Sequence, residues 1–535
     1  MKMLVSNSCV ELHTDDKERG YSIPYVHVNR KQDVFKTSVR NIEYVLKLAG
    51  KSLDEAPAKV KHIVDKERRR RDATAKAMNK EYKENWLYKH QQMGIEIAKA
   101  NDRFCFFYDT RTGKTPMSLA IINEALKENP DEKWLVLCPL ILIEQAWLPD
   151  AETFFPNLKV VNLHATTKAK RLEKFKQQGN VYLMNIEAFI KYQDEIEKLP
   201  ITGCIVDESS TMKSTKSKFG KAAVKYSMKV KRWYLLSGAP APNGEWEYYR
   251  QLQSVDFYGV HSSWTQFKLY FFNNVSYTPQ FEKLVIKEEK KQELQDLIKQ
   301  YAVYVDKEDV LTLPGRSFDT VPVEVPDDLM KHYKHLKDQL YLEVGDDLIT
   351  AASAAAKINK LRQVTSGFVI NTGTKETHLL SMYKFNKLME LLRELGDKQV
   401  LVWCFYRKEF EIIKKLLGER CALVYGAVNN EDKNVAINAF KAGEVQYLIA
   451  NPASIDKGVT LVNAHTVVYF SLSHSYELWK QSIDRVYGDV RSQKHFCSYY
   501  LLMANKTIDK VLFETVTNKA DISYATLNYL KKGDV

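Results

Sequence analysis

From residue 85 to residue 240, short apolar runs alternate with longer segments in which apolar residues recur every three or four positions. Short apolar runs bounded by polar turns are typical of buried strands, and the longer periodic segments are typical of amphipathic helices. Strands separated by helices predict β-α-β units, and therefore a parallel sheet with helices on both faces. The predicted strands are FCFFY (104–108), WLVLC (134–138), VYLMNI (181–186), CIVD (204–207) and WYLLS (233–237).

The same alternation returns from about residue 380. The stretch 245–375 between the two regions is aromatic, rich in lysine and mainly helical in its pattern. The chain is therefore predicted to contain two α/β lobes separated by a helical insert. The predicted strands of the second lobe are VLVWCF (400–405), ALVY (422–425), VQYLIA (445–450), TVVYF (466–470) and FCSYYLL (496–502).

Residues 1 to about 80 have a different pattern. In SVRNIEYVLKLAG the apolar residues recur at helical spacing, and Gly50 is a plausible helix stop. A strongly charged helical pattern follows, with Lys66 and four consecutive arginines at 68–71. We predict a small, mostly helical accessory domain here. Its charge fits either a solvated helix face or a DNA contact, and a DNA contact would make binding depend steeply on salt.

Composition narrows the class of protein. Hydrophobic residues make up 45% and charged residues 27%, which excludes a disordered, collagen-like or membrane-embedded chain. No apolar run approaches the roughly 20 residues needed to cross a bilayer, and the apolar stretch at the start is too short for a secretory signal. The seven cysteines are scattered without a CxxC pair. These features predict a reduced, cytoplasmic protein without structural zinc or a membrane partner.

The charge balance is basic. Seventy-nine Lys and Arg against 67 Asp and Glu give a formal net charge of +12. Solubility explains this excess as well as nucleic-acid binding does, so the second explanation needs support from motifs.

A candidate phosphate-binding loop follows the first predicted strand. FCFFY runs into DTRTGKT, and the helical pattern PMSLAIINEALKE comes next, which is the strand–loop–helix order that such a loop requires. The helix start would cradle phosphates, Lys114 would reach the outer phosphates and the Thr115 hydroxyl would ligate Mg²⁺. The full GxxxxGK[ST] pattern has glycine at position 108, where this chain has Tyr108.

Two acidic residues end another predicted strand. CIVDE places Asp207 and Glu208 where a buried strand leaves a parallel sheet, and ligands bind at such strand ends. The pair fits a metal-binding aspartate followed by a glutamate that activates water. It also fits a strand that simply leaves the core into solvent.

Taken in order, these pieces resemble the Swi/Snf-type branch of the superfamily-two helicases and DNA translocases. In LYKHQQMG, Gln91 resembles the glutamine that reads adenine in that family. LVLCPL, which contains Pro139, resembles the motif that touches the nucleic-acid backbone, and DESS matches the first two residues of the DEAH-type box. LSGAPAPN is close to the family's LTGTPIQN, with Ser237 and Gly238 matching the element that couples ATP to DNA movement. KEDVLTLPGR resembles the stretch that leads into the inter-lobe region.

The resemblance continues in the second half of the chain. VWCFYR, with Tyr406 and Arg407, is similar to the fourth helicase motif. ANPASIDKGVTLVNA is similar to the fifth, with Gly458 in place, and QSIDR matches the sixth, QxxDR, at Arg485. The second arginine of that motif normally stands three residues further on, where this chain has glycine, and the nearest candidate is Arg491.

The resemblance implies two RecA-like α/β lobes that close on ATP and Mg²⁺. Asp207 would orient the metal, Glu208 would activate the attacking water, and Arg485 with Arg491 would complete the site from the second lobe. Further implied nucleotide contacts are Thr112, Gly113 and Gly458, and further implied nucleic-acid contacts are Pro139, Asn185, Tyr406 and Arg407. The implied domains are an accessory domain at 1–80, a first lobe at 81–310 with a helical insertion at about 245–300, an inter-lobe region at 311–378 and a second lobe at 379–535.

The expected activity is DNA-stimulated ATP hydrolysis that drives a helicase or branch-migration motor. The expected partner is DNA that is duplex, forked, branched or single-stranded, in the cytoplasm of a bacterium or of a phage host. An RNA helicase is an alternative. A nucleic-acid-binding scaffold with a degraded ATP site is another, suggested by Tyr108 and by the glycine at position 488.

Overall fold

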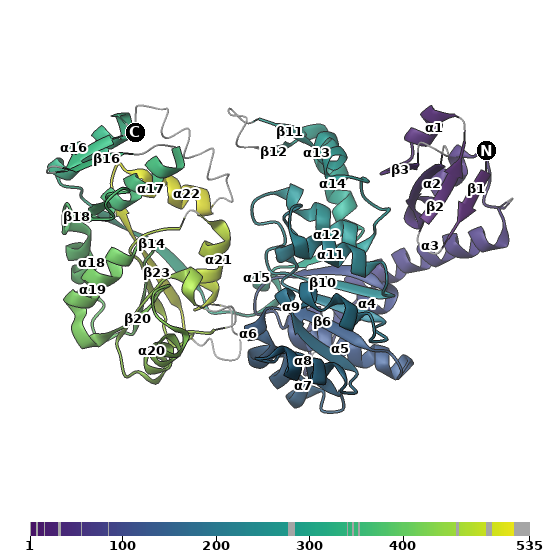
Figure 1. Cartoon of the computed structure of the whole chain (residues 1–535), viewed down its shortest axis with the longest axis horizontal. Coiled ribbons are helices and arrows are strands. Elements are labelled where there is room, and N and C mark those ends of the chain that lie inside the picture. Colours follow the sequence, from purple (N-terminus) through teal and green to yellow (C-terminus); the bar gives the residue numbers. More distant parts are fainter. Residues whose placement is uncertain are drawn as a thin grey trace. The chain divides into compact units, whose positions relative to one another are not determined.

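A computed structural model gives the structure of the chain (Figure 1). The chain forms two compact units, Met1–Leu311 and Thr312–Val535. None of the described helices combines the length and the hydropathy that crossing a bilayer requires. The structure describes residues 2–6, 9–14, 16–29, 34–54, 56–83, 85–275, 284–339, 341–344, 347–350, 354–455, 459–473, 475–487 and 495–517.

A seven-stranded, fully parallel sheet forms the centre of the first unit. Its strands are buried on both faces because side chains of alternate residues enter two different cores: Phe104 and Phe106 enter one, Cys105 and Phe107 the other. In spatial order the strands are β13 (Ala302–Val305), β5 (Arg103–Tyr108), β10 (Arg232–Leu236), β9 (Gly203–Asp207), β6 (Trp134–Cys138), β8 (Val181–Asn185) and β7 (Val160–Asn162).

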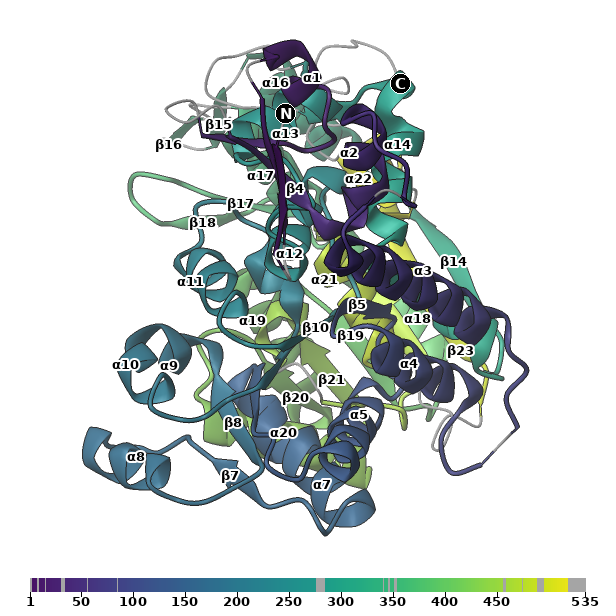
Figure 2. The ribbon, with the colours of Figure 1, turned by 90° about the vertical axis from the view of Figure 1, so that its right-hand side faces the viewer.

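Helices cover both faces of this sheet (Figure 2). One face is covered by α4 (Lys89–Ala100), α5 (Lys114–Glu128) and α7 (Leu148–Phe154), and the other by α9 (Ile186–Lys191), α11 (Lys218–Ser227), α12 (Tyr248–Val255), α13 (Trp264–Phe271) and α14 (Glu288–Lys299). The shorter elements are α6 (Leu140–Leu142), α8 (Lys168–Phe175), α10 (Gln193–Ile196), α15 (Lys307–Val310) and the hairpin of β11 (Phe272–Asn274) and β12 (Leu284–Ile286).

The N-terminal region contains the predicted helices and, in addition, a four-stranded antiparallel sheet that was not predicted. Its strands are three to five residues long, and polar residues separate their apolar positions, which hides them beside the strong helical pattern that follows. The elements are β1 (Lys2–Val5), β2 (Cys9–His13), α1 (Lys17–Tyr21), β3 (His27–Asn29), β4 (Val34–Ser38), α2 (Ile42–Leu48) and α3 (Ala58–Asn79).

Polar contacts join this N-terminal region to the first lobe. The backbone N–H of Ser38 donates to the carbonyl of Tyr258 at 3.0 Å, and its hydroxyl donates to the carboxylate of Asp256. The guanidinium of Arg40 lies 4.0 Å from the centre of the Tyr301 ring, and the Tyr301 hydroxyl donates to the same Asp256 carboxylate at 3.0 Å. The Asp256 carboxylate thus accepts from both Ser38 and Tyr301, so one connected hydrogen-bond network joins the N-terminal region to the first lobe.

The second unit is built on a six-stranded parallel sheet. In spatial order its strands are β14 (Arg316–Val323), β23 (Cys497–Ala504), β22 (Thr466–Tyr469), β19 (Val400–Trp403), β21 (Tyr447–Ala450) and β20 (Cys421–Val424). One face is covered by α16 (Asp327–Gln339), α17 (Ala354–Thr365), α20 (Asn430–Ala442), α21 (Tyr476–Asp484) and α22 (Ile508–Thr517), and the other by α18 (Tyr383–Glu394) and α19 (Arg407–Leu417). Two small hairpins pair β15 (Tyr341–Val344) with β16 (Asp347–Thr350) and β17 (Phe368–Ile370) with β18 (Thr377–Leu379).

All ten strands predicted from apolar runs are present, and both lobes have the predicted parallel sheets. The stretch 311–378, predicted as an inter-lobe region, contributes β14, α16 and α17 to the second unit. All seven cysteines are buried, as expected for small hydrophobic residues in strand-like runs.

A buried ion pair ties α18 to α22 in the second unit. The Nζ of Lys384 lies 2.7 Å from a carboxylate oxygen of Asp509, and the two side chains are only 1% and 6% exposed. Replacing Lys384 by methionine is expected to lower the free energy of unfolding by about 3–5 kcal/mol, because a buried carboxylate loses its partner. Denaturant unfolding measures this. Lys387→Met on the same helix, which breaks a surface pair with Glu390, is the control and should cost less than about 1 kcal/mol.

Candidate functional site

The residues singled out in the first lobe come together at one edge of its sheet. Parallel strands all end at the same edge, and ligands of open α/β sheets bind there. Lys114, Ser237 and Asp207 lie at or just beyond the ends of β5, β10 and β9, which are adjacent strands in that order. Pro139 and Asn185 stand at the ends of the next two strands, β6 and β8.

The loop between β5 and α5 turns through two left-handed residues. Arg111 has φ of 63° and Gly113 has φ of 75°, so the chain reverses directly into the start of α5. The ammonium of Lys114 lies inside this turn and donates to the carbonyls of Tyr108 and Asp109 at 3.1 and 3.0 Å. The loop therefore already holds a cation where the N–H groups of a 15-residue helix begin, and both features favour an anion.

Gln91 and its neighbour His90 support the loop from α4. The side-chain amide of Gln91 donates to the carbonyl of Gly113 at 2.8 Å, and the Nε2 of His90 lies 2.7 Å from the carbonyl of Thr112. A Cβ on Gly113 would lie 2.1 Å from the Gln91 amide nitrogen and would displace that side chain, and the φ of 75° also favours glycine there. Burial lowers the pKa of His90, which favours the neutral form of its ring. No sequence pattern pointed to His90.

Tyr108 occupies the position where the phosphate-loop pattern has glycine. Its side chain is fully buried, and its hydroxyl donates to the carbonyl of His90 at 2.9 Å. The loop turns three and five residues later, at Arg111 and Gly113. The tyrosine therefore links β5 to α4 by a hydrogen bond. The turn itself is made at other residues, so it does not need a glycine at position 108.

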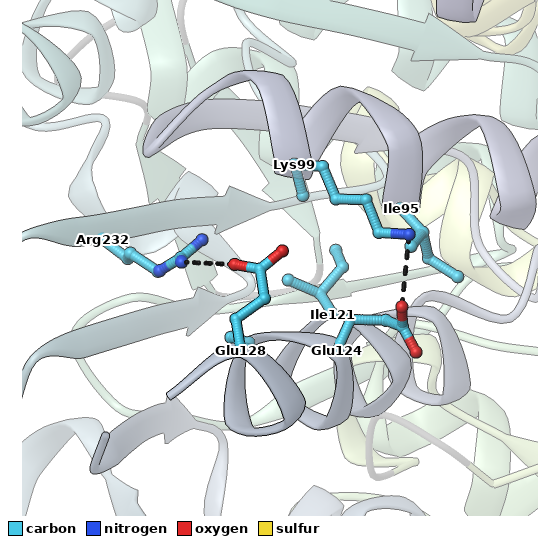
Figure 3. Close-up of a pocket in the computed structure, with 8 residues that line it drawn as sticks. Ile95, Lys99, Ile121, Glu124, Glu128 and Arg232 are labelled. Atoms are coloured by element: carbon cyan, nitrogen blue, oxygen red, sulfur yellow. Dashed lines mark hydrogen bonds and ion pairs between the residues drawn. The ribbon is translucent and has the colours of Figure 1, made fainter. Parts of the chain in front are cut away.

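One ion pair joins α4 to α5, and another joins α5 to β10, at the ends of the helices remote from the loop. Figure 3 shows Lys99 of α4 beside Glu124 of α5, 3.2 Å apart, and Glu128 of α5 beside Arg232 of β10, 3.4 Å apart. The cavity between them measures about 10 Å³, which is room for one water molecule. It is too small for a nucleotide, so it contributes to the packing of the two helices rather than to a ligand site.

Asp207 and Glu208 form an acidic pair beside the loop. Asp207 is buried, and its carboxylate accepts from the indole N–H of Trp147 and from the backbone N–H of Glu208, both at 3.0 Å. Burial and the nearby Glu208 raise the pKa of Asp207 to about 6, while Lys114 opposes this shift. Glu208 has φ of 61°, a strained conformation for a residue with a side chain, and such strain is common at functional sites.

Trp147 is a site residue that sequence reasoning missed. Trp147→Phe is expected to lower the free energy of unfolding by about 1–3 kcal/mol more than Trp134→Phe, because it removes the indole hydrogen bond to a buried carboxyl. Trp134 is equally buried, and its indole N–H has no hydrogen-bond partner within the described part of the chain, so it controls for the loss of ring volume. Denaturant unfolding of both variants measures the difference, and equal losses would contradict the prediction.

Ser237 and Gly238 pack directly on the phosphate loop. Ser237 is fully buried, and its backbone N–H donates to the carbonyl of Phe106 in β5 at 3.4 Å. A Cβ on Gly238 would lie 3.0 Å from a side-chain carbon and 3.1 Å from the backbone nitrogen of Thr110. Gly238 therefore lies close against Thr110 of the loop, with no room between them for a larger side chain.

A second missed residue, Gln251 of α12, links the acidic pair to this segment. Its side chain is fully buried, accepts from the Ser209 hydroxyl at 2.8 Å and donates to the carbonyl of Pro240 at 2.7 Å. Ser209 follows Glu208, and Pro240 follows Gly238 by two positions. One amide therefore fixes the spacing of two candidate motifs, which no local sequence pattern reveals.

Two of the candidate nucleic-acid contacts are half-buried beside these groups, and the other two are in the second unit. Pro139 and Asn185 precede the first turns of α6 and α9, and the Asn185 amide donates to Glu187 at 2.8 Å. In the second unit, Tyr406 and Arg407 stand at the start of α19. The Tyr406 hydroxyl donates to the side chain of Asn359 at 2.6 Å, and Arg407 is exposed beside Glu411 at 3.1 Å.

Arg485 is buried at the end of α21, within the second unit. Its guanidinium donates to the carbonyls of Ile455 and Val459 at 3.5 and 3.4 Å, and its own carbonyl accepts from the N–H of Leu461. The structure thus brings the sixth motif together with the ends of the fifth. Gly458 and Arg491 lie outside the described residues.

The residues at the edge of the first sheet fit a triphosphate with Mg²⁺. The helix start and Lys114 supply the positive groups that phosphate requires. Thr115, in the first turn of α5, and Asp207 supply a hydroxyl and a carboxylate, which are the oxygen ligands that Mg²⁺ prefers.

Comparison with known proteins identifies two domain families in the chain. The SNF2-related domain matches residues 84–393, and the helicase conserved C-terminal domain matches residues 383–487. A structure titled "Sulfolobus solfataricus SWI2/SNF2 ATPase core in complex with dsDNA" is 18% identical and covers 84% of this chain and 97% of that one, with a TM-score of 0.38.

Three curated relatives illustrate the range of the family. "Putative protein p41" of Acyrthosiphon pisum secondary endosymbiont phage 1 is 25% identical over 78% of this chain and 93% of its own length. The Drosophila melanogaster "SWI/SNF-related matrix-associated actin-dependent regulator of chromatin subfamily A-like protein 1" is 20% identical, and human "DNA annealing helicase and endonuclease ZRANB3" is 22% identical. They align over 82% and 83% of this chain, but the chain spans only 55% and 41% of their lengths. With the SNF2-related domain matching more than half of its residues, the chain belongs to the SNF2 family of helicase-like ATPases.

Proposed function

We propose that this protein is a DNA-stimulated ATPase that remodels forked or branched DNA by translocation. The observation that carries the proposal is the order of groups along one sheet edge: phosphate loop, coupling segment and acidic pair on the adjacent strands β5, β10 and β9. The contact between Gly238 and Thr110 gives a direct route from the nucleotide loop to the coupling segment.

The first unit binds and activates the substrate. Gln91 recognises the adenine, and the loop from Thr112 to Lys114 holds the phosphates against the start of α5. Thr115 and Asp207 hold Mg²⁺, which supplies neutralising charge to the phosphates when it is bound. Glu208 accepts a proton from the water that attacks the γ-phosphorus, so ADP and inorganic phosphate are released.

The second unit completes the site when the two units close on ATP. Gly458 would contact the nucleotide, and Arg485 would bring its guanidinium to the charge that develops on the γ-phosphate, with Arg491 as the second candidate. The hydrogen bonds of Arg485 to Ile455 and Val459 are 3.4–3.5 Å long, at the weak end for such bonds. A phosphate oxygen can therefore replace these carbonyls at small cost.

DNA is the proposed nucleic-acid substrate along which the protein translocates. Pro139 and Asn185 of the first unit and Tyr406 and Arg407 of the second are proposed to contact its backbone. A preference for forks or branches is supported by the human relative, whose name includes DNA annealing helicase. The phage relative supports a bacterial or phage-host cytoplasm as the place of action.

The decisive experiment measures ATP turnover without nucleic acid and with single-stranded, duplex, forked and four-way DNA, and with RNA, at one stated salt concentration. We expect stimulation by DNA, with the largest effect for forked or four-way substrates. Stimulation by RNA alone would indicate an RNA helicase. No stimulated turnover with any of them would indicate a non-catalytic scaffold and would overturn the proposal.

A further inference from the structure

Helix α3 carries an unusual concentration of positive charge for this chain. Its 22 residues contain eight Lys and Arg against three Asp and Glu, a net charge of +5, whereas all 535 residues together carry +12. Part of this charge is neutralised locally: Arg70 pairs with Glu67 at 2.8 Å, and Glu43 of α2 is shared by Arg68 and Arg71.

The remaining cations form an exposed row, which we name the α3 stripe: Lys59, Lys66, Arg69 and Lys76. Together with the exposed His62 and Ala73 they are spaced three and four residues apart in turn, so they share one side of the helix. Within the described part of the chain, none of the four cations forms an ion pair with a carboxylate. Two exposed acids, Asp65 and Asp72, lie along one flank of the row.

Other residues of α3 anchor the helix to both parts of the first unit. Val60 and Val64 are buried in the core of the N-terminal sheet, and Ala77 is buried in the core that contains α4. Figure 2 shows α3 lying along α4. The Asn101 side chain, at the end of α4, accepts from Arg70 and donates to Thr74, both at 2.8 Å. The stripe is therefore a fixed feature of the lobe that holds Gln91 and Lys114.

A fixed row of cations matches the phosphate backbone of nucleic acid. From Lys59 to Lys76 the stripe extends over about 26 Å at 1.5 Å per residue. Duplex DNA carries about one negative charge per 1.7 Å of its axis, and neutralising phosphates releases condensed counterions. Binding of single strands relies on aromatic side chains interleaved with the charges, and the stripe contains none. The observations therefore favour duplex over single-stranded DNA.

We propose that the α3 stripe is a second DNA-binding surface, which holds the backbone of a duplex against the first unit. This inference rests on the proposed function, because the α3 stripe would be an additional binding surface for the DNA that stimulates ATP turnover. A protein that acts at a fork or branch must hold two duplex arms, and a surface outside the two helicase domains provides for the second arm.

The test uses the full-length chain with Lys59, Lys66, Arg69 and Lys76 all changed to glutamine. Fluorescence anisotropy with a labelled duplex of about 30 base pairs, without ATP, is recorded at several salt concentrations between about 50 and 200 mM. We expect the affinity to fall about tenfold or more. Removing up to four phosphate contacts should also make the slope of log K against log salt shallower by about 3 to 4.

The matched control changes four exposed lysines of the same unit to glutamine: Lys127, Lys159, Lys176 and Lys198. It alters net charge equally and should keep the affinity and the salt slope of the wild type. Thermal unfolding checks that both variants fold. Unchanged binding by the stripe variant, an equal loss in the control, or a loss confined to single-stranded DNA would overturn the proposal.

The two proposals fail in distinguishable ways. If the wild-type chain binds duplex DNA through the stripe but shows no DNA-stimulated ATP turnover, the proposed ATPase function is wrong and the proposed binding surface is retained. If DNA stimulates ATP turnover and the stripe variant needs no more DNA than the wild type for half-maximal stimulation, the proposed binding surface is wrong and the proposed ATPase function is retained.

Discussion

Lys114→Ala is expected to lower DNA-stimulated ATP turnover by at least about a hundredfold. Lys114 is a point charge inside the phosphate loop, 3.0–3.1 Å from the carbonyls of Tyr108 and Asp109. In the proposed reaction it faces charge that grows on the outer phosphates, and removing one such group typically costs 10²–10³-fold. Phosphate release at saturating duplex DNA measures the effect, and ATP binding should weaken in the same variant.

The control for this variant is Lys127→Ala, on the same helix. Lys127 is exposed near the end of α5, and its ammonium lies 2.6 Å from Glu124. It carries the same charge and loses the same atoms, but it stands more than three helical turns from the loop. Turnover within twofold of wild type is expected for it. If Lys114→Ala retained a tenth or more of wild-type turnover, the phosphate loop would have no place in the chemistry.

The sheets and the grouping of the candidate motifs in the first lobe could be predicted because they depend on local patterns. Each buried strand is a short apolar run, and a parallel sheet brings every strand end to one edge. Asp207 and Lys114 are far apart in the chain, yet knowing that both follow parallel strands was enough to expect them together. The structure adds that burial raises the pKa of Asp207 and that Lys114 is near enough to oppose this rise.

The supporting contacts could not be predicted, because each joins residues that are distant in sequence. Trp147 donates to a carboxylate 60 residues later, and Gln251 spans two loops that precede it by 42 and 11 positions. No local sequence pattern marks either residue as part of a site. The strands β1–β4 were missed for another reason: they are too short for their alternation to outweigh the helical signal of 38–50.

Tyr108 shows how a departure from a motif is resolved by packing. As a sequence feature it suggested a degraded nucleotide site, since the pattern has glycine there. In the fold its ring is buried and its hydroxyl holds the carbonyl of His90, whose ring in turn holds the loop at Thr112. The turn itself is made at Arg111 and Gly113. This geometry supports an intact loop and argues against the scaffold alternative.

Glu208→Gln is expected to bind ATP as wild type does and to hydrolyse it at least about a hundredfold more slowly. The amide keeps the size of the carboxylate but cannot accept a proton from water, and a positioned general base contributes about 10²–10⁴-fold. Its negative charge also helps to raise the pKa of Asp207, so the neutral amide should let Asp207 ionise more readily and leave Mg²⁺ binding intact. Fluorescent-nucleotide titration and single-turnover hydrolysis, measured on the same preparation, separate the two effects.

Glu152→Gln is the matched control, since Glu152 is an exposed carboxylate on α7 of the same lobe and makes the same change of charge. It should hydrolyse ATP at the wild-type rate. Wild-type turnover in Glu208→Gln would show that Glu208 takes no part in the mechanism, and catalysis would then not explain its strained backbone. Loss of nucleotide binding in that variant would instead assign Glu208 to holding the substrate, because a residue that acts only on the attacking water cannot change the affinity for ATP.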